Sequence, residues 1–544
     1  MKTKYFLLAA MGLMALPGAA QETYQSEKLI ANDLNGTARY VGMGGAMEAL
    51  GGDISTISSN PAGIGLFRRS TIAASGGFVA QSNATKSFNY DGVPFNFKGD
   101  KTNASFDQGG FVWARRTGKS SFLNFAFNYH KSKNFDQILS AAGMLQNASQ
   151  SKLTSNKYLG NRLGASQTTA VDAAYAGAYN INGDYITGLM EYYTDADNNI
   201  VDPSTATGVT RHVDYANGQS YRFGQYQHGY IGSYDFNISG NIKDQIYLGL
   251  TFGIHDVHYN SDKVYNELLE QNQYDQSWEK MRITGTGFDV KFGAIFRPIA
   301  TSPFRIGLYV NSPVFYDLRL RSSFDMDMGK VGDNSSVQQR GNDVDYDYHV
   351  YTPWKFGLSL GHTIGDYLAL GFTYEYSDYG TIDNRIDDGG YYDPYYDDWY
   401  YSSSSDDAMN DNTKDVLKGV HTLKFGVEYK PISILALRLG YNFVSPKFEK
   451  DGFRDQTISS PGTSNATSTD YTNWRSTNRI TAGIGVTLDK FFMDLAYQYS
   501  QTNGDFYPFQ DYNSTRNVVD GNYVAPNKVS NKRNQLLFTV GYRF

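Results

Sequence analysis

The chain lacks cysteine, and it contains only 5 Trp and 14 Pro among its 544 residues. The absence of cysteine excludes disulfides, iron–sulfur clusters and a thiol nucleophile, and it excludes a lipidated N-terminal cysteine as well. Long hydrophobic runs are also missing, because after residue 20 no apolar stretch approaches the roughly 20 residues of a membrane helix. A protein that spans a membrane with helices is therefore not expected.

Charge of one sign is not dominant either. The formal net charge is −7, and acidic and basic residues are mixed along the chain, which argues against a nucleic-acid-binding surface. What the chain has in abundance is Gly (55), Tyr (44) and Phe (33). This composition favours one large β structure, and the aromatic residues suit the two interfacial girdles of a membrane barrel.

The first twenty residues form a predicted secretory signal. Lys2 and Lys4 supply the charged start, residues 5–16 supply the apolar stretch, and small residues at 17–20 precede an expected cut before Gln21. The alternatives are a membrane helix or a buried core helix. The stretch is too short to span a membrane, and no positively charged stop follows it.

The remainder of the chain contains fourteen segments of about 10 residues in which apolar and polar side chains alternate. In the last one, Leu536, Phe538, Val540, Tyr542 and Phe544 share a face. In lipid every backbone polar group must be paired internally, so a β protein can span only as a closed barrel. We therefore predict an all-β fold, a transmembrane antiparallel β-barrel of about 14 strands. The expected strands are 71–80, 110–116, 121–130, 230–240, 245–255, 287–297, 304–318, 353–363, 367–376, 420–430, 434–444, 479–488, 491–500 and 535–544.

The connections between these segments alternate between short and long. Tight turns are expected at 116–120, 241–244, 298–303, 365–366, 431–433 and 489–490. The long connections are 81–109, 131–229, 256–286, 319–352, 377–419, 445–478 and 501–534. Bacterial outer-membrane barrels have short periplasmic turns, long external loops and an even number of strands. This pattern predicts a multi-pass protein of the bacterial outer membrane with both ends in the periplasm.

Two of the long connections have further features. Ile138–Leu145 and Ala170–Ala178 are candidates for short amphipathic helices within 131–229. Asp387–Asp407 is a low-complexity tract rich in Tyr, Asp and Ser, with too little aliphatic content to form a core. We expect this tract to be a mobile external loop.

The stretch Tyr40–Phe67 has a different character from the strands. It has no period of two, it is rich in small residues, and it ends in the turn Asn60-Pro61-Ala62-Gly63. A segment this apolar must be buried, and the interior of a fourteen-stranded barrel is wide enough to hold it. We therefore predict that residues 21–69 form an N-terminal plug, or hatch, inside a barrel formed by residues 70–544. The alternative is a disordered periplasmic leader.

The same stretch carries a family resemblance. Thr37-Ala38-Arg39, residues 42–46, Gly52-Asp53 and residues 59–63 resemble the N-terminal hatch of the FadL family. Asn311-Ser312-Pro313-Val314 also resembles a turn of that family. The resemblance implies a fourteen-stranded outer-membrane transporter of long-chain fatty acids, aromatic hydrocarbons or similar hydrophobic compounds. It also implies that the hatch, with Asn60, Pro61, Ala62, Gly63, Met43 and Met47, gates the passage of ligand. A related branch of the family serves in protein secretion.

The motifs that point to catalysis or metal binding are weak. Residues 357–361 match a G-x-S-x-G nucleophile elbow, but the alternation of apolar residues runs straight through them. Gly42-x-Gly44-Gly45 is followed by no acidic residue at the spacing of a dinucleotide loop, which makes plug packing the better explanation. His255 and His258 would face opposite sides of one strand, so we do not expect them to bind the same metal ion. The acidic residues of 393–407 could bind a hard cation weakly, although a solvated loop explains them better. We expect no enzymatic activity, no cofactor and no resident metal.

Charged residues at inward strand positions are more informative. In a membrane strand, tolerated charges should face the interior of the barrel. Their simplest role is to pair with one another and anchor the plug, and their more specific role is to bind a ligand carboxylate. The candidates for lumen-facing charge are Lys291, Arg305, Lys355, Arg438 and Glu375, together with Asp235, Asp289, Lys424, Glu428, Asp494 and Arg543.

From the sequence we expect a monomeric, passive transporter for hydrophobic small molecules, with external loops that capture the ligand. The expected partners are outer-membrane lipid, a hydrophobic ligand and, during biogenesis, the barrel-assembly machinery; no nucleic acid is expected. The alternative is an interaction protein or secretion-system component of the same fold, in which the Tyr-rich loops are docking surfaces. An apolar tunnel beside the plug would favour transport, whereas a solidly packed interior would favour docking.

Overall fold

The computed structural model describes residues 21–544 except for residues 86, 91–92, 97–98, 151, 154–189, 198–206, 209, 215–216, 271–273, 330–335, 341–342, 396, 456–457, 459, 465–467, 510–521 and 523. The predicted signal peptide and the predicted helix at Ala170–Ala178 lie outside the described residues. Within the described ranges, no helix combines the length and the apolar character needed to cross a membrane.

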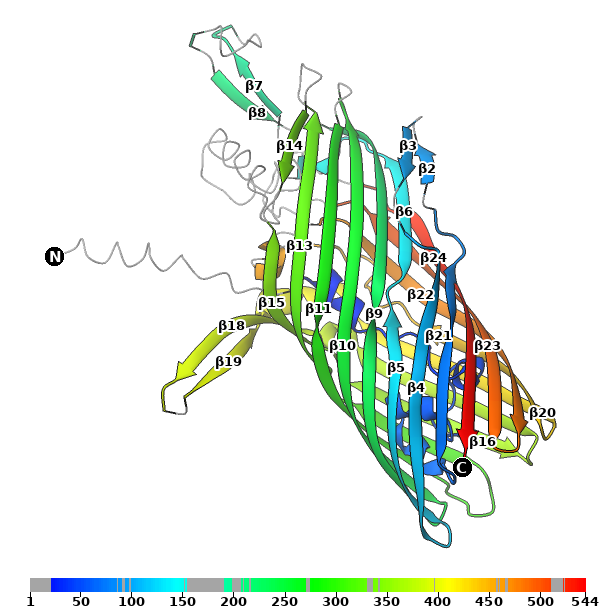
Figure 1. Ribbon diagram of the computed structural model, residues 1–544. Helices are drawn as coiled ribbons and strands as arrows, with labels where there is room; N and C mark the ends of the chain where they lie inside the picture. The colour runs from blue at the N-terminus through cyan, green and yellow to red at the C-terminus, as the bar shows by residue number, and fades with distance from the viewer. Residues whose placement is uncertain are drawn as a thin grey trace.

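The main element is an antiparallel β-sheet that closes on itself as a barrel of fourteen strands (Figure 1). Closure comes from β1 (Thr71–Gln81), which pairs with β4 on one side and with the last strand, β24, on the other. Two of the strands each consist of two stretches, β12 with β13 and β15 with β16. The predicted fold class is therefore confirmed. After β1 the barrel contains β4 (Thr102–Gly118), β5 (Ser121–Asn134), β9 (Gly218–Ile242), β10 (Ile246–Leu269), β11 (Tyr274–Phe296), β12 (Arg305–Asn311), β13 (Phe315–Gly329), β15 (Val344–Tyr351), β16 (Lys355–Ile364), β17 (Leu368–Asp378), β20 (Gly419–Ile432), β21 (Leu435–Val444), β22 (Tyr471–Leu488), β23 (Phe491–Tyr507) and β24 (Asn527–Arg543).

The strands present an apolar outer face and an inner face rich in polar groups. On β10, Phe252 and Ile254 point outward and are 53% and 49% exposed, whereas Thr251 and His255 are buried. A soluble sheet seldom leaves a continuous belt of large apolar side chains uncovered, but the lipid-facing side of a barrel requires one. The alternation that the sequence predicts is therefore the division between the lipid-facing and lumen-facing sides of the wall.

The two ends of the barrel differ. Short turns join the strand pairs β4–β5, β9–β10, β11–β12, β16–β17, β20–β21 and β22–β23 at the end where the C-terminus also lies (Figure 1). We call this the short-turn end. At the opposite, long-loop end, β9, β10 and β11 continue to 25, 24 and 23 residues, well beyond the length predicted for them.

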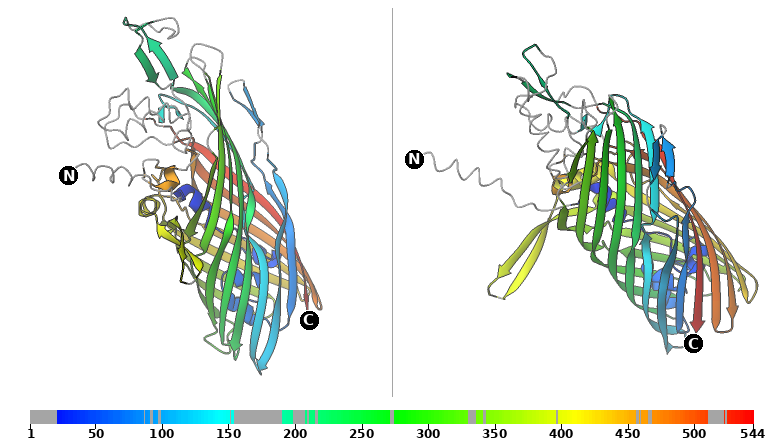
Figure 2. Two further views of the ribbon diagram at one scale, coloured as in Figure 1. Left: turned by 60° about the vertical axis from the view of Figure 1, so that its left-hand side comes forward. Right: turned by 45° about the horizontal axis from the view of Figure 1, so that its top comes forward.

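Two predictions about the long-loop end are wrong. Residues 137–144 form strand β6 (Gln137–Met144) instead of a helix, because β9 extends past the end of β5 and offers its free edge for pairing. The tract predicted as a mobile loop forms most of a hairpin, β18 (Asp383–Asp393) and β19 (Asp398–Ser405), that projects sideways from the barrel (Figures 1 and 2). Helix α6 (Asp407–Val416) follows the hairpin. The smaller strands at this end are β2 (Ser87–Tyr90), β3 (Val93–Asn96), β7 (Met190–Thr194), β8 (Thr210–Asp214) and β14 (Ser336–Arg340).

Residues 21–70, which we call the inner segment, lie within the ring of strands (Figure 2). The segment is built from short helical turns: α2 (Thr23–Ser26), η1 (Glu27–Leu29), α3 (Ala38–Gly42), η2 (Ile54–Ser58) and η3 (Pro61–Leu66). Nearly all of its side chains between residues 37 and 65 are buried. It leads directly into β1 at the short-turn end.

Candidate functional site

The inner segment runs from the long-loop end of the barrel to the short-turn end. At the long-loop end, Tyr24 stacks on Phe448 with 5.1 Å between the ring centroids. At the short-turn end, the side-chain amide of Asn124 donates to the carbonyl of Ile64 at 2.7 Å, and that of Asn241 donates to the carbonyl of Gly65 at 3.1 Å. Any molecule that passes through the barrel interior must therefore pass along this segment.

Polar side chains define where the short helices of the inner segment begin. Thr37, Asp53 and Asn60 each accept a hydrogen bond from a backbone N–H of the turn that follows, which is the N-cap arrangement. The Thr37 hydroxyl also donates to Asp53 at 2.8 Å, so two of the caps are bonded to each other. These local bonds give a segment without a long helix a single defined path.

Glycines on the strands let the inner segment approach the wall closely. A Cβ atom at Gly249 would overlap the backbone of Pro61, one at Gly371 would overlap the backbone of Ala46, and one at Gly426 would overlap the backbone of Met43. Backbone cannot rotate out of the way as a side chain can. The part of the inner segment from residue 43 to 63 is therefore fitted directly against the strands.

The predicted hatch residues fall into two separate places. Asn60 is fully buried and donates to the carbonyl of Glu48 at 3.0 Å, while Ala62 packs with Tyr247 and Ile295. A side chain at Gly63 would overlap Thr56. Met43 and Met47 belong to another apolar cluster, with Leu34, Tyr40 and Leu50. The structure thus brings the two methionines together, and the Asn60–Gly63 turn together, but not the two groups with each other.

Arg438 takes part in a buried ionic network that anchors the inner segment. Its guanidinium contacts Glu428 and Asp494, each at 2.6 Å. Glu428 also accepts two hydrogen bonds from Arg39 of the inner segment, at 3.0 and 3.1 Å. Sequence analysis singled out Arg438 but not Arg39, whose role depends on a partner nearly 400 residues away.

Glu375 lies in a second network of the same kind. Its carboxylate is 3.1 Å from Lys424, and Lys424 is 2.9 Å from Glu48 of the inner segment. Arg305 lies nearer the short-turn end and donates to the carbonyl of Leu50 at 2.9 Å. Lys355 differs from these residues, because it has no hydrogen bond or ion pair to any side chain in the described part of the chain.

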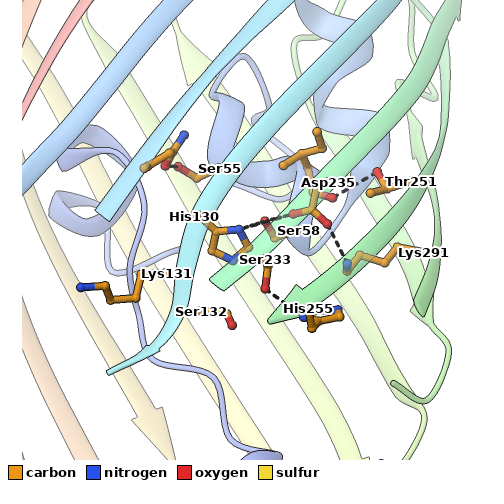
Figure 3. Close-up of polar contacts among 12 residues, drawn as sticks. Ser55, Ser58, His130, Lys131, Ser132, Ser233, Asp235, Thr251, His255 and Lys291 are labelled. Carbon is orange, nitrogen blue, oxygen red and sulfur yellow. Dashed lines mark hydrogen bonds and ion pairs between the residues drawn. The ribbon is translucent and has the colours of Figure 1, made fainter. Parts of the chain in front are cut away.

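Lys291 is the centre of a third network (Figure 3). Its ammonium lies 2.9 Å from Asp235 and 2.7 Å from Asp289. His130 lies 3.4 Å from Asp235, and His255 lies 3.2 Å from Asp289. Ser58 of the inner segment donates to Asp235 at 2.9 Å, so this network also ties the segment to the wall.

Parts of the third network resemble a hydrolase triad in composition only. Ser58 and Asp235 approach the same nitrogen of His130, so the imidazole cannot relay a proton between them. Ser233 and Asp289 do contact opposite nitrogens of His255, but Ser233 is fully buried and no substrate can reach it. Among the described residues there is no group of three or more His, Asp or Glu side chains that could hold a metal ion. We assign this network a supporting role.

A cavity of about 310 Å³ lies beside the outer part of the inner segment. The third network borders it through Ser58 and His130. Its walls combine apolar side chains with an excess of basic ones. The apolar lining includes Leu34, Val79, Phe135 and Trp474. The basic lining comprises Lys28, Lys133, Lys355, Lys424, Lys447, Arg475, Arg479 and Arg533, and the acidic lining comprises Glu27, Asp33, Asp107, Asp136 and Glu375.

The barrel wall is interrupted beside this cavity. The strands β4 and β5 pair from the turn up to Gln108 and His130, and their pairing stops there. Beyond that point β4 pairs only with β1, while β5 follows β9 with a register shift between Lys131 and Lys133. Asp107 on one side of the break, and His130 and Lys133 on the other, all line the cavity.

Asn35 of the inner segment spans this break. Its side-chain amide donates to Asp107 on β4 and to the carbonyl of Lys131 on β5, both at 2.9 Å. Close by, the backbone N–H of Asp33 donates to the carbonyl of Ser132 at 2.8 Å. Burial would raise the pKa of Asp33, but the nearby charges of Lys133, Arg533 and Arg479 hold it below its usual value. The break in the wall is thus closed from the inside by residues 33–35.

Sequence analysis missed the role of residues 33–35. The signal that was present is the stretch Asn32-Asp33-Leu34-Asn35, in which three polar residues stand shortly before the Thr37 cap. Asn and Asp side chains commonly bond to nearby backbone. The sequence does not reveal that the backbone in question belongs to two strands that separate at this level.

No family model and no curated protein matches the sequence. Solved structures do match over almost the whole chain. One is a FadL homologue from Pseudomonas aeruginosa, with 10% identity and a TM-score of 0.48 over 95% of this chain and 100% of that one. Others are the toluene transporter TbuX of Ralstonia pickettii, with 12% identity and a TM-score of 0.45, and the toluene transporter TodX of P. putida, with 11% identity and a TM-score of 0.46. Each of these two covers 94% of this chain and is itself covered to 99%. The first of these structures bears the name of the family that the hatch residues resemble.

Proposed function

We propose that this protein is a passive transporter of the bacterial outer membrane that takes up hydrophobic molecules with an acidic head group, such as long-chain fatty acids. The observation that carries the proposal is the position of the cavity, beside a break in the wall that a few inner-segment residues close. The apolar outer belt supports a membrane location, and in outer-membrane barrels the long loops face outward.

The cavity lining supports this choice of ligand. Lys355 lies within the electrostatic influence of Glu375 but forms no direct ion pair among the described residues, and it shares the cavity with Leu34, Val79 and Phe135. A carboxylate head would complement Lys355, while an alkyl chain would cover the apolar side chains. A neutral aromatic hydrocarbon would desolvate these charged groups without pairing them, which is unfavourable. Of the two ligand classes that the sequence suggested, fatty acids therefore fit better.

The route that we propose leads sideways. When residues 33–35 move away from the wall, the cavity opens between β4 and β5, and the apolar part of the ligand enters the membrane without crossing the aqueous periplasm. The Asn60–Gly63 turn stays fixed against the strands and acts as the anchor from which the segment moves. The step requires no energy input, because the ligand moves down its own gradient.

Substitution of Asn35 tests this route. Asn35→Ala removes both hydrogen bonds across the break, so we expect uptake of a labelled long-chain fatty acid to rise severalfold in cells with matched surface levels. Asn83→Ala is the control. Asn83 also bonds to a neighbouring chain segment, but it lies exposed at the long-loop end and does not line the cavity. Equal uptake by Asn35→Ala, Asn83→Ala and the wild type would contradict the proposed route.

The role of the anchor has its own test. Asn60→Ala should leave barrel assembly intact, because strand pairing holds the barrel together, and should change uptake severalfold. Lys355→Met should lower fatty-acid uptake but not entry of toluene, because only the acid has a charge for Lys355 to bind. Parallel losses of both ligands in Lys355→Met would show that the lysine supports the fold instead of the ligand.

One observation favours a second function, that of a docking component. The β18–β19 hairpin projects clear of the barrel, and Tyr395 on it is 86% exposed. In addition, an apolar cluster that includes Tyr24, Leu29 and Tyr348 fills part of the interior toward the long-loop end. Deletion of residues 386–404 is the experiment that distinguishes transport from docking. Uptake should persist without the hairpin, whereas a loss of protein export or of complex formation with unchanged uptake would favour docking.

A further inference from the structure

The short-turn end of the barrel is strongly basic. We define the turn rim as residues 67–70, 114–121, 242–246, 297–304, 363–368, 430–434, 488–491 and 542–544, which are the short turns and the two chain ends beside them. The rim contains ten Lys or Arg residues and three Asp residues. Its side chains therefore carry +7, whereas the whole chain carries −7, so all other residues together carry −14. The protein is electrically polarised along the barrel axis.

Basic residues occur at most of the turns of the rim, but in unequal numbers. Of the six short turns, only the β16–β17 turn lacks a basic residue. The β4–β5 turn carries Arg115, Arg116 and Lys119, which are all exposed. Single cations follow at the other turns, and two more precede β1. Six of the ten cations lie at the neighbouring strands β24, β1, β4 and β5, so the excess positive charge is concentrated on this side of the rim.

Most of the rim cations are not neutralised by the protein itself. Within the described residues only two of the ten lie near a carboxylate, namely Arg68 beside Asp244 and Lys430 at 3.8 Å from Glu428. Arg116 and Arg297 donate instead to backbone carbonyls of their own turns. Counter-charges for the remaining cations must therefore come from outside the chain.

The rim lies directly next to the apolar outer belt. Trp113 precedes Arg115 on β4, Ile242 precedes Lys243, and Ile299 follows Arg297, and these three apolar side chains are 54–58% exposed. The belt ends where the rim begins. In a membrane, the level immediately beyond the hydrocarbon is that of the lipid head groups.

We propose that the turn rim binds the phosphates of anionic phospholipids in the leaflet that surrounds the short-turn end. Basic residues at a membrane surface attract acidic lipids, and the attraction acts within a Debye length. The position of these cations directly beside the apolar belt favours lipid over a protein partner, because head groups of the surrounding leaflet lie at this level. The proposal rests on the membrane-embedded barrel of the proposed function, but not on ligand uptake.

Native mass spectrometry tests the proposal on the full-length mature protein in detergent micelles. The probe is an equal mixture of phosphatidylglycerol and phosphatidylcholine with identical acyl chains, which differ only in head-group charge. The wild type should retain severalfold more phosphatidylglycerol. The triple variant Arg115→Gln, Arg116→Gln, Lys119→Gln should lower that ratio severalfold. A matched control, Lys280→Gln, Lys414→Gln, Lys450→Gln, removes three exposed cations at the long-loop end and should leave the ratio unchanged.

The outcomes separate this proposal from the proposed transport function. Folded yield of the variants is checked by heat-modifiable migration on gels, and fatty-acid uptake by the rim variant should equal that of the wild type. Equal retention of the two lipids by the wild type would overturn the proposal and leave an acidic periplasmic protein as the occupant of the rim. The same loss in the control as in the rim variant would also overturn it, because the effect would then follow total charge and not the rim. Neither result would alter the fatty-acid uptake that the proposed transport function predicts.

Discussion

The two ends of the inner segment are held in different ways. Between residues 43 and 63 its backbone lies against glycines of several strands, among them Gly249, Gly293 and Gly371, where a Cβ atom would overlap it. Between residues 21 and 35 it is held by side-chain hydrogen bonds and by aromatic contacts such as that of Tyr24 with Phe448. The backbone of residues 43–63 is thus fitted to the wall by shape, whereas residues 21–29 are packed and bonded through side chains and residues 33–35 are attached by a few polar contacts beside a cavity.

This difference indicates where movement is possible. Close-packed backbone has no alternative position without displacing the strands, because protein interiors behave as tightly packed solids. Residues 33–35 border a cavity of about 310 Å³, so they can move into space that already exists. Movement of the inner segment without unfolding is therefore expected at residues 33–35 and not at residues 43–63.

The largest expected effect, on the amount of folded protein, comes from adding a side chain where Gly249 contacts the backbone of Pro61. In Gly249→Leu the new side chain would overlap the backbone of Pro61, and an overpacked site of this kind costs about 3 kcal/mol or more. We expect little folded, heat-modifiable protein in the membrane. Gly118→Leu is the control, because a Cβ there meets Ser121 at an ordinary 3.5 Å. Normal folded yield of Gly249→Leu would show that the Asn60–Gly63 turn is free to move, and the comparison of the two ends would fail.

A smaller effect is expected from the ionic anchor of the fixed end. Glu428→Gln leaves the guanidinium groups of Arg39 and Arg438 without their shared carboxylate, and removal of one partner from a buried pair costs about 3 kcal/mol. The barrel should still assemble but should unfold at lower denaturant concentration. In the control Glu449→Gln, an exposed pair with Lys418 is lost, which should cost about 0.5 kcal/mol at most. Equal unfolding midpoints for the two variants would mean that the Arg39 network does not hold the segment.

The strands themselves could be predicted well from the sequence. The segment 367–376 corresponds to β17 (Leu368–Asp378), and the tight turns fall where they were expected. Lipid on one side of the wall and a polar interior on the other enforce alternation, so the pattern is local and visible. The predictions fail where this constraint ends. β10 was expected to end at His255 but continues to Leu269. The extension was missed because apolar and polar residues need not alternate where neither face of a strand meets lipid.

The site could be predicted only in part. Lys355 and Arg438 were found because a charge on a membrane strand has to face the interior. The break between β4 and β5 was not found, because it depends on which partner each strand follows beyond Gln108 and His130. Asn35 was missed for the same reason: its two acceptors, on Asp107 and Lys131, are brought together only by the closed barrel. Local patterns reveal which face a residue occupies, whereas the gap itself is a property of the whole sheet.

The smallest expected effect concerns pH and the movable end. The pKa of Asp33 lies below its usual value, because Lys133, Arg533 and Arg479 outweigh its burial. A carboxylate with a lowered pKa contributes its full stabilisation above the unfolded pKa of about 3.9 and loses it only as the pH falls through the folded value. Hydrogen exchange at residues 31–35, corrected for intrinsic rates, should therefore show equal protection at pH 7 and pH 5. Asp33→Asn should lower that protection severalfold at both pH values, because the neutral amide attracts the three cations only weakly. A loss of protection in the wild type between pH 7 and pH 5 would contradict this account.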